Sequence, residues 1–466
     1  MTQIDTVLAQ AEAGMAAAQQ RWINWLRIPS IGAAPEHAAD CRAAAEFARQ
    51  QLEDMGFDAK LRETGGHPAI VAHHPGPAAR LGGGEVPHLL YYGHYDVQPA
   101  DPLSLWNSPP FEPTIVDGPH GPRVYARGAV DDKGQVAMWL GAFRAWFDAT
   151  GGLPCRITAL IEGEEETGSV NFKPFVIANR DELKADICII SDTGMWDIDT
   201  PAISSSLRGM TYMEVTLKAA SRDLHSGMYG GSALNPINAL TRALGQLTDD
   251  QGRIQVPGFY DGITDISAGK ANQWASLGFD ESKFLGDIGL SVPVGEAGRG
   301  ALERLWARPT VDICGIWGGY SGPGTKTVIA AEASAKVSFR LVPGQDPEAV
   351  QQGFIAFMKA RVPADAKLEF TTFGTSPGLE MNTDSPFMQA AQAALTDEYG
   401  RPAVMIGCGG SIPVVDTITR ELGMDSVLMG FGLDDDQVHS PNEKFEVRCF
   451  QQGLRSHARL LGKLAG

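Results

Sequence analysis

Four carboxylates occupy five positions from Glu162 to Glu166, directly after the apolar run from Ile157 to Ile161. The apolar run predicts a buried strand, so the acids gather where that strand leaves the core. Like charges this close raise one another's pKa and resist burial, and a bound metal ion is the simplest compensating charge. A solvated acidic turn is the alternative, and this segment alone leaves both open.

Metal-competent residues also follow other strand-like segments of the chain. Each of them taken singly is more often a cap, a turn residue or a satisfied surface group. Together they provide two histidines and at least three carboxylates, a set that suits zinc, cobalt or manganese better than calcium or a structural zinc site. In chain order these residues are His94 with Asp96, Asp131 with Asp132, Asp192, and His439.

The elements that must position these residues follow the pattern of an α/β sheet covered by helices. Such sheets place their chemistry outside the carboxyl ends of the strands. Asp131 and Asp132 precede an expected helix over residues 136–146, where carboxylates also serve as caps. The other expected elements are helices over residues 6–28 and 38–55 and strands over residues 69–72, 88–92, 157–161 and 187–190.

A change of pattern near residue 206 indicates a second domain. Residues 213–217 and 335–340 alternate apolar and polar side chains, as half-exposed strands do. A helical stretch over residues 236–247 and a long connection rich in Gly and Pro lie between them. We therefore expect an α+β domain at residues 206–377, inserted into a first domain made of residues 1–205 and 378–466. The chain returns to the first domain through a helix over residues 386–398.

Composition narrows the function classes. The 38 basic and 56 acidic residues give a formal net charge of -18, which argues against nucleic acid or an anionic membrane as a partner. The first residues lack a basic region followed by an apolar core, and no apolar run approaches membrane-spanning length. The six cysteines are scattered, and several lie in apolar runs. This is typical of thiols in a reducing compartment, so we expect a cytoplasmic protein.

Five motifs occur in order along most of the chain: residues 93–97 (GHYDV), 127–134 (RGAVDDKG), 162–169 (EGEEETGS), 191–192 (SD) and 439–443 (HSPNE). In sequence and order they resemble the M20 metallopeptidase family, which contains carboxypeptidase G2, aminoacylase, succinyl-diaminopimelate desuccinylase and carnosinase-type dipeptidases. Within that family the carnosinase-type dipeptidases are the most similar. This likeness rests on residues 223–227 (DLHSG), 321–329 (SGPGTKTVI), 338–343 (SFRLVP) and 409–414 (GGSIPV).

The resemblance implies two divalent metal ions per subunit, bridged by Asp131. We expect zinc, with manganese and cobalt as the alternatives. The implied ligands are His94 and Asp192 for one ion and Glu166 and His439 for the other.

The resemblance also divides the acidic run into roles. Glu165 is implied as the general base that deprotonates a water held between the two ions. Asp96 is implied as the residue that orients His94. Glu164 is then a solvent-facing spacer.

The implied architecture is a zinc-peptidase-like catalytic domain, with a mixed sheet flanked by helices, interrupted by an α+β lid domain that forms a homodimer. His225 of one subunit would act in the partner's active site and steady the oxyanion. Arg340 suits bidentate binding of a C-terminal carboxylate. The implied substrate contacts are Arg340, Thr327, Ser411 and Gly410. On the residues alone, an ordinary turn at His225 and an exposed Arg340 paired with Glu332 or Asp346 are the alternatives.

Two departures from the dipeptidase pattern put the substrate in doubt and leave the metal chemistry intact. Phe373 stands where a histidine is usual, and Ala330 stands where a proline is usual. We expect a dinuclear metal-dependent hydrolase that cleaves small peptides with a free C-terminal carboxylate. An N-acyl amino acid amidohydrolase or desuccinylase would use the same metals with a different pocket. A non-catalytic peptide- or metal-binding relative would be expected to have lost a ligand or Glu165.

Overall fold

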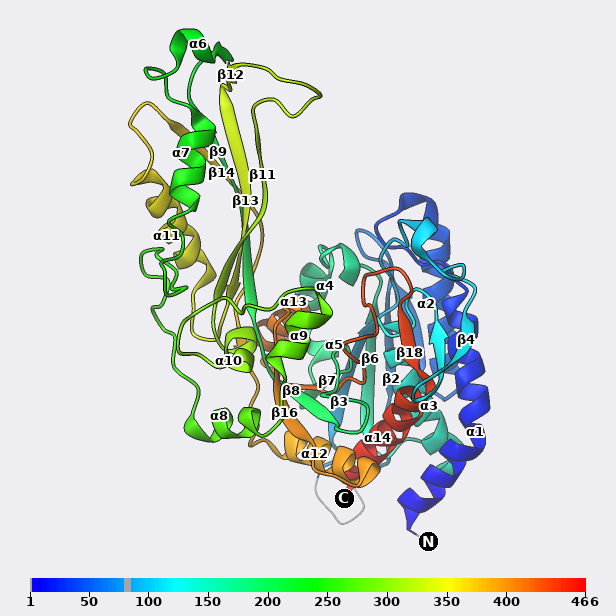
Figure 1. Cartoon of the computed structure of the whole chain (residues 1–466). Coiled ribbons are helices and arrows are strands. Elements are labelled where there is room, and N and C mark those ends of the chain that lie inside the picture. The colour runs from blue at the N-terminus through cyan, green and yellow to red at the C-terminus, as the bar shows by residue number, and fades with distance from the viewer. Residues whose placement is uncertain (1, 79–84) are drawn as a thin grey trace. The chain divides into compact units, whose positions relative to one another are not determined.

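The computed structural model describes residues 2–78 and 85–466, and the chain divides into two compact units (Figure 1). Unit 1 comprises Met1–Ser205, Met381–Ile406 and Pro413–Gly466, and unit 2 comprises Ser206–Glu380 and Gly407–Ile412. Within the described part of the chain, no helix is both long enough and apolar enough to span a bilayer.

Unit 1 is built on a mixed sheet. Its strands are β1 (Asp58–Arg62), β2 (Ala69–His74), β3 (His88–His94), β6 (Arg156–Glu162), β7 (Ile187–Ile190), β8 (Ala202–Leu207), β16 (Val404–Cys408) and β17 (Ser426–Leu428). They lie in the order β1-β2-β6-β3-β7-β17-β8, with β16 paired to β8. The strands β6, β3, β7 and β17 run parallel, so their carboxyl ends meet at one edge.

The helices of unit 1 cover this sheet. They are α1 (Gln3–Leu26), α2 (Ala38–Glu53), α3 (Lys133–Thr150), α4 (Phe172–Ala178), α5 (Arg180–Leu183), α12 (Pro386–Tyr399), α13 (Pro413–Thr417) and α14 (Val447–Ala465). Helix α3 packs against α1, α14 and strand β3, so it is buried on nearly every side. Its Phe143 meets Tyr91 of β3 edge-on, with the ring centroids 4.9 Å apart. A helix that is apolar all round needs such a central place.

Unit 2 contains a four-stranded antiparallel sheet in the order β11-β13-β9-β14. Its strands are β9 (Gly209–Lys218), β11 (Thr310–Gly318), β13 (Glu332–Leu341) and β14 (Lys367–Ser376), with β10 (Leu224–His225) and β12 (Val328–Ile329) paired separately. Strand β9 alternates buried and half-buried side chains, as expected from its sequence. The core of this unit lies between the sheet and the helices α7 (Pro236–Leu244) and α11 (Pro347–Lys359).

The long Gly- and Pro-rich connection of unit 2 contains helices that its sequence pattern did not indicate. These are α8 (Ala268–Ala275), α9 (Glu281–Asp287) and α10 (Ala301–Trp306), and the short α6 (Ser226–Tyr229) follows His225. Ser267 and Asp280 begin α8 and α9, and each side chain accepts a hydrogen bond from a backbone N–H of the first turn. Good caps allow short helices here despite weak apolar periodicity.

The expected fold class is confirmed: an α/β unit with a mixed sheet flanked by helices is accompanied by an α+β unit. The expected helix over residues 6–28 ends two residues early, at Leu26. Ile28 directly precedes Pro29, and the residue before a proline disfavours helical geometry.

Candidate metal centre

The centre lies at the carboxyl ends of three neighbouring parallel strands of unit 1. His94 is the last residue of β3 and pairs in register with Glu162, the last residue of β6. Tyr92 of β3 is opposite Ile190, the last residue of β7, so Asp192 emerges beside His94. The acidic run continues directly from β6. The sheet register therefore delivers three of the expected motifs to one place.

Among the residues that the structure describes, two groups of three side chains could each hold a metal ion, and Asp131 belongs to both. One group is His94, Asp131 and Asp192, and the other is Asp131, Glu166 and His439, with the candidate ligand atoms of each group within 4.8 Å of one another. The Asp131 oxygens face different histidines: Oδ1 lies 3.1 Å from His94 Nε2, and Oδ2 lies 2.9 Å from His439 Nε2. The structure thus brings together all five expected ligands around one shared carboxylate.

His94 is oriented as a metal ligand would be. Its Nδ1 donates to the backbone oxygen of Asp96 at 3.1 Å, so the lone pair is on Nε2. That Nε2 atom is buried and has no hydrogen-bond partner among the described residues. It lies 3.9 Å from Asp192 Oδ2 as well as near Asp131. A buried nitrogen that makes no hydrogen bond and faces two carboxylates fits a divalent cation.

Asp96 supports two parts of the centre at once. Its backbone oxygen, rather than its carboxylate, makes the hydrogen bond to His94, since Oδ1 is 3.4 Å from Nδ1. The carboxylate instead accepts from the backbone N–H groups of Glu165 at 3.3 Å and Glu166 at 3.0 Å. Asp96 therefore fixes the turn that carries both acids, a contact that the sequence analysis did not foresee.

The side chain of Asp132 does not cap the helix that it precedes, although its position in the sequence suggested such a cap. It begins α3 but makes no capping hydrogen bond with that helix. Its Oδ2 accepts from the backbone N–H of His94 at 3.1 Å instead. The side chain therefore links the helix entrance to the end of β3.

His439 reaches the centre from a loop with unusual backbone geometry. Gln437, His439 and Asn442 all have positive φ values, with 62° at His439. Such geometry is uncommon outside glycine and is retained where surrounding contacts hold it. Asn442 supplies such contacts, because its side chain bonds to the backbone of Leu105 and Asn107.

Glu443 holds the loop before Asp131 in place. This buried carboxylate accepts from the backbone N–H of Gly128 at 2.9 Å, of Val130 at 3.0 Å and of Asp131 at 3.1 Å, and from the Arg127 guanidinium at 2.8 Å. Glu443 and Arg127 belong to two of the sequence motifs, but no role for either residue was predicted. Their opposite charges were the signal in the sequence that could have suggested an ion pair. The two motifs lie far apart along the chain, so only the folded structure shows that these residues meet.

The contacts within the centre shift the pKa values of its ionisable side chains. Burial opposes ionisation of Asp131, yet its contacts with His439 and His94 outweigh burial and hold the pKa of this carboxyl well below its usual range. Contacts with Asp131 and then Glu166 raise the pKa of His439 to about 10. Burial, followed by repulsion from Asp131, raises the pKa of Asp192 to about 7. A divalent cation would replace these protons as the compensating charge.

The acidic run divides into distinct environments. Glu162 is buried and accepts from Tyr92 Oη at 2.7 Å, and burial raises its pKa to about 8. Glu164 accepts from Asn171 Nδ2 at 2.9 and 3.0 Å, so it is tied to its own loop rather than free in solvent. Burial raises the pKa of Glu165 well above its usual range. Glu166 accepts from Gln98 Nε2 at 2.7 Å.

The expected lid and substrate residues lie in unit 2. Arg340 donates to Ser411 Oγ at 3.4 Å, and among the described residues it forms no ion pair with Glu332 or Asp346. His225 is exposed, and its Nδ1 accepts from the backbone N–H of Gly227 at 3.0 Å. Gly410 and Thr327 are also exposed. The structure brings Arg340 and Ser411 together within this unit.

The two residues that depart from the dipeptidase pattern, Phe373 and Ala330, lie in different structural environments. Phe373 is exposed at a bulge of β14 and packs edge-on against Tyr212. Ala330 is buried directly after β12.

Comparison with known proteins agrees with the motifs. Residues 90–463 match the model of peptidase family M20/M25/M40. The chain is 32% identical to human Beta-Ala-His dipeptidase over 383 residues, covering 81% of this chain and 75% of that protein. It is 31% identical to the Cys-Gly metallodipeptidase DUG1 of Candida albicans, covering 92% of this chain and 91% of that protein. A solved M20 family metallo-carboxypeptidase, Sso-CP2 from Sulfolobus solfataricus, superposes with a TM-score of 0.84 at 30% identity, covering 96% of this chain and 99% of that one.

The family match covers most of the chain, includes every motif of the metal centre, and agrees with the fold. The chain belongs to peptidase family M20 and is a metallopeptidase.

Proposed function

We propose that this metallopeptidase hydrolyses dipeptides and other small peptides with a free C-terminal carboxylate, using two divalent metal ions bridged by Asp131. The observation that carries the proposal is the placement of the two Asp131 oxygens, each against a different histidine at about hydrogen-bond distance. Each histidine has a further carboxylate nearby, Asp192 for His94 and Glu166 for His439. A mixed nitrogen and oxygen set of this kind suits zinc, with manganese and cobalt as alternatives.

Bound divalent ions would polarise the scissile carbonyl and lower the pKa of the attacking water. We assign proton transfer to Glu165. It lies outside both candidate ligand groups, while its backbone is held by Asp96 beside the ligand Glu166. A carboxylate in this position accepts the proton from water and delivers it to the leaving amine.

The substrate class rests on unit 2 and on the relatives. We assign the C-terminal carboxylate of the substrate to Arg340, whose guanidinium suits bidentate binding, with Ser411, Gly410 and Thr327 as further contacts. The hydrogen bond between Arg340 and Ser411 supports a shared role for these two. Both curated relatives compared above are named as dipeptidases.

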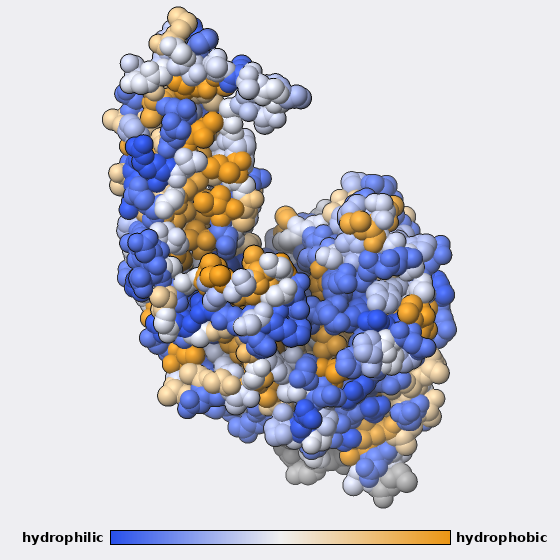
Figure 2. Space-filling model, in the orientation of Figure 1, coloured by the Kyte–Doolittle hydropathy of each residue, from blue (hydrophilic) through white to orange (hydrophobic). Residues whose placement is uncertain are grey.

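We further propose that the protein is a cytoplasmic homodimer in which His225 acts on the partner's substrate. Unit 2 exposes apolar side chains on its sheet, and Figure 2 shows them gathered over β11 and β13. Ile313, Ile316 and Trp317 of β11 are each about half exposed. Exposed apolar patches of this kind mark interaction surfaces. The free thiols of Cys41, Cys188 and Cys449 suit a reducing compartment.

We assign Glu443 as the residue that positions the bridging carboxylate. It accepts from three backbone N–H groups of the loop, including that of Asp131 itself, and it is neutralised by the buried Arg127. Residues that orient metal ligands influence metal affinity nearly as strongly as the ligands do.

Removing the metal tests the activity class. Dialysis against a chelator should abolish hydrolysis, and zinc, manganese or cobalt should restore it, because the metal supplies the electrophile. We expect the restored enzyme to cleave Ala-Ala faster than N-acetyl-alanine, two substrates that release the same leaving amino acid. Full activity in chelator would refute the metal mechanism, and preference for N-acetyl-alanine would identify an amidohydrolase instead.

Substituting Glu165 tests the proton-transfer role. Glu165→Gln should lower kcat by about a hundredfold to ten-thousandfold, because general-base catalysis contributes on that order. Metal content measured by atomic emission should stay at the wild-type level. Glu164→Gln is the matched control and should retain most of the activity, since the Glu164 side chain bonds only to Asn171 in the described structure. Equal rates for the two variants would remove Glu165 from the mechanism.

Substituting Glu443 tests ligand positioning. Glu443→Gln should weaken metal binding by roughly tenfold to a hundredfold, as for other residues that orient ligands. The measurement is a cobalt titration of the metal-depleted protein followed by visible absorption. Glu398→Gln is the control, because Glu398 is a buried acceptor of Arg455 and Arg459 that contacts none of the candidate ligands. Unchanged cobalt affinity in Glu443→Gln would show that Glu443 stabilises the fold but does not position Asp131 for metal binding.

Mixing two inactive variants tests catalysis across the dimer. His225→Ala and Glu165→Gln should each have little activity alone. When they are unfolded together and refolded, half of the dimers are mixed, and each mixed dimer has one complete site, so we expect about a quarter of wild-type activity. If His225 acts within its own chain, the mixture stays as inactive as its components.

A further inference from the structure

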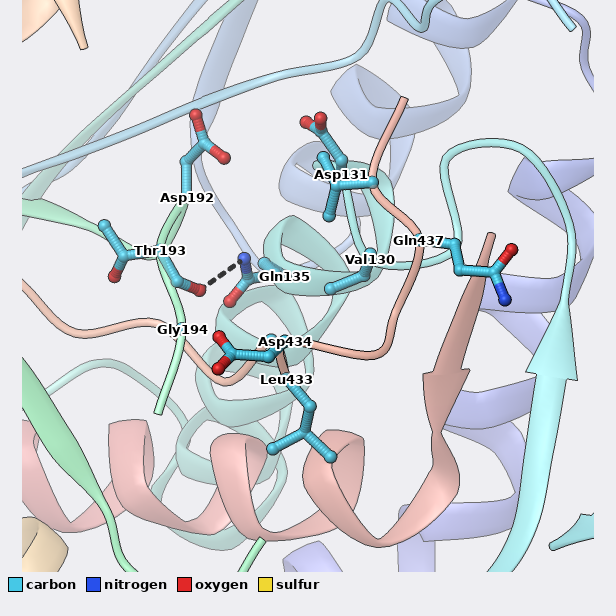
Figure 3. Close-up of a pocket in the computed structure, with 11 residues that line it drawn as sticks. Val130, Asp131, Gln135, Asp192, Thr193, Gly194, Leu433, Asp434 and Gln437 are labelled. Carbon is cyan, nitrogen blue, oxygen red and sulfur yellow. Dashed lines mark hydrogen bonds between the residues drawn. The ribbon is translucent and has the colours of Figure 1, made fainter. Parts of the chain in front are cut away.

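A cavity of about 430 Å³ adjoins the candidate metal centre, and the described residues that line it all belong to unit 1. Asp131 and Asp192 form part of its wall, so the cavity opens directly onto the carboxylates that would hold metal. Figure 3 shows these two side chains toward one end, with Asp434 and Leu433 toward the other. The volume exceeds what one extended side chain needs.

The walls combine apolar side chains with the carboxylate of Asp434. Val130, Leu433 and Val438 contribute apolar side chains. Gln135 also lines the cavity, but both ends of its amide are already used: Nε2 donates to Thr193 O at 3.1 Å, and Oε1 accepts from the backbone N–H of Phe431 at 2.8 Å. Gln135 therefore contributes to the surface of the cavity, and its amide is already hydrogen-bonded within the protein.

Asp434 differs from the two acidic residues that follow it, because those two are neutralised by a lysine. Asp435 and Asp436 both accept from Lys444 Nζ, at 3.0 and 2.6 Å. Asp434 has no hydrogen bond or ion pair with any residue of segments 2–78 and 85–466, and it belongs to neither candidate ligand group. Its negative charge is thus available to whatever occupies the cavity.

The position of this charge limits the group that can reach it. The α-ammonium group of a dipeptide is two bonds from the scissile carbon, so it stays near the metal-binding end. Only a long side chain on the same residue extends toward Asp434. The carboxylate of the leaving residue is assigned to Arg340 of unit 2. The side chain of the residue on the acyl side of the scissile bond is therefore the one that this cavity can bind. A lysine or arginine side chain presents an apolar stem and a cationic end, which match these walls.

We propose that the cavity binds the side chain of the amino-terminal residue of the substrate and that Asp434 selects a basic side chain there. This specificity rests on the dipeptidase activity proposed above. A charge-assisted hydrogen bond to a partly exposed carboxylate would favour lysine over an uncharged side chain of equal length by roughly tenfold.

The test compares Lys-Ala with norleucyl-Ala, which has the same four-carbon stem and no ammonium group. For the wild-type enzyme, kcat/KM should be roughly tenfold higher for Lys-Ala. Asp434→Asn should bring this ratio close to one, and Asp434→Lys should make Glu-Ala a better substrate than Lys-Ala. Asp435→Asn removes the same charge one residue away, outside the cavity wall, and should keep the wild-type ratio.

The outcomes separate this inference from the proposed function. A wild-type ratio near one, or a ratio that Asp434→Asn does not change, would overturn the inference while hydrolysis of both peptides upholds the dipeptidase activity. An equal drop of the ratio in Asp435→Asn would also overturn it, since a general field effect would then explain the preference. If the metal-loaded enzyme cleaves no dipeptide at all, the proposed function and this inference both fail.

Discussion

Asp131 is a buried carboxylate whose two oxygens face two histidines from distant parts of the chain, and the rest of the centre depends on this contact. Burying a carboxylate is unfavourable unless opposite charge and hydrogen bonds compensate it. Here two further carboxylates, Asp192 and Glu166, approach the same point, so two imidazoles alone leave an excess of negative charge. Divalent cations are the compensation that this arrangement favours.

The fold holds these like charges together through backbone contacts rather than through the ligands themselves. Parallel pairing of β6, β3 and β7 brings three motifs to one edge of the sheet. Asp96 fixes the turn of Glu165 and Glu166, and Glu443 fixes the loop of Asp131. Helix α3 begins at this loop and is buried between α1 and α14, so the centre is anchored in the core of unit 1. Rigid anchoring of this kind keeps ligand geometry from relaxing when charge is added.

Much of this could be predicted from the sequence, because the relevant signals are local. The apolar runs ending at Ile161 and Ile190 predicted β6 and β7, and the family resemblance, which is confirmed, supplied the candidate ligands. Contacts between distant segments were not accessible in this way. The pairing of Glu443 with Arg127 joins residues more than three hundred positions apart, and the Asp96 contacts depend on sheet register. The helices α8 and α9 were missed because their capping side chains, rather than apolar periodicity, begin them.

We propose that Asp131 bridges two metal ions, and anomalous diffraction at the zinc absorption edge, from crystals of the zinc-loaded protein, tests this directly. A bridged pair of ions should give two peaks about 3.5–4 Å apart. One peak should lie against His94 and Asp192, the other against Glu166 and His439, with one Asp131 oxygen at each. A single peak in the zinc-saturated protein, or two peaks that do not share Asp131, would show that Asp131 is not a bridging ligand.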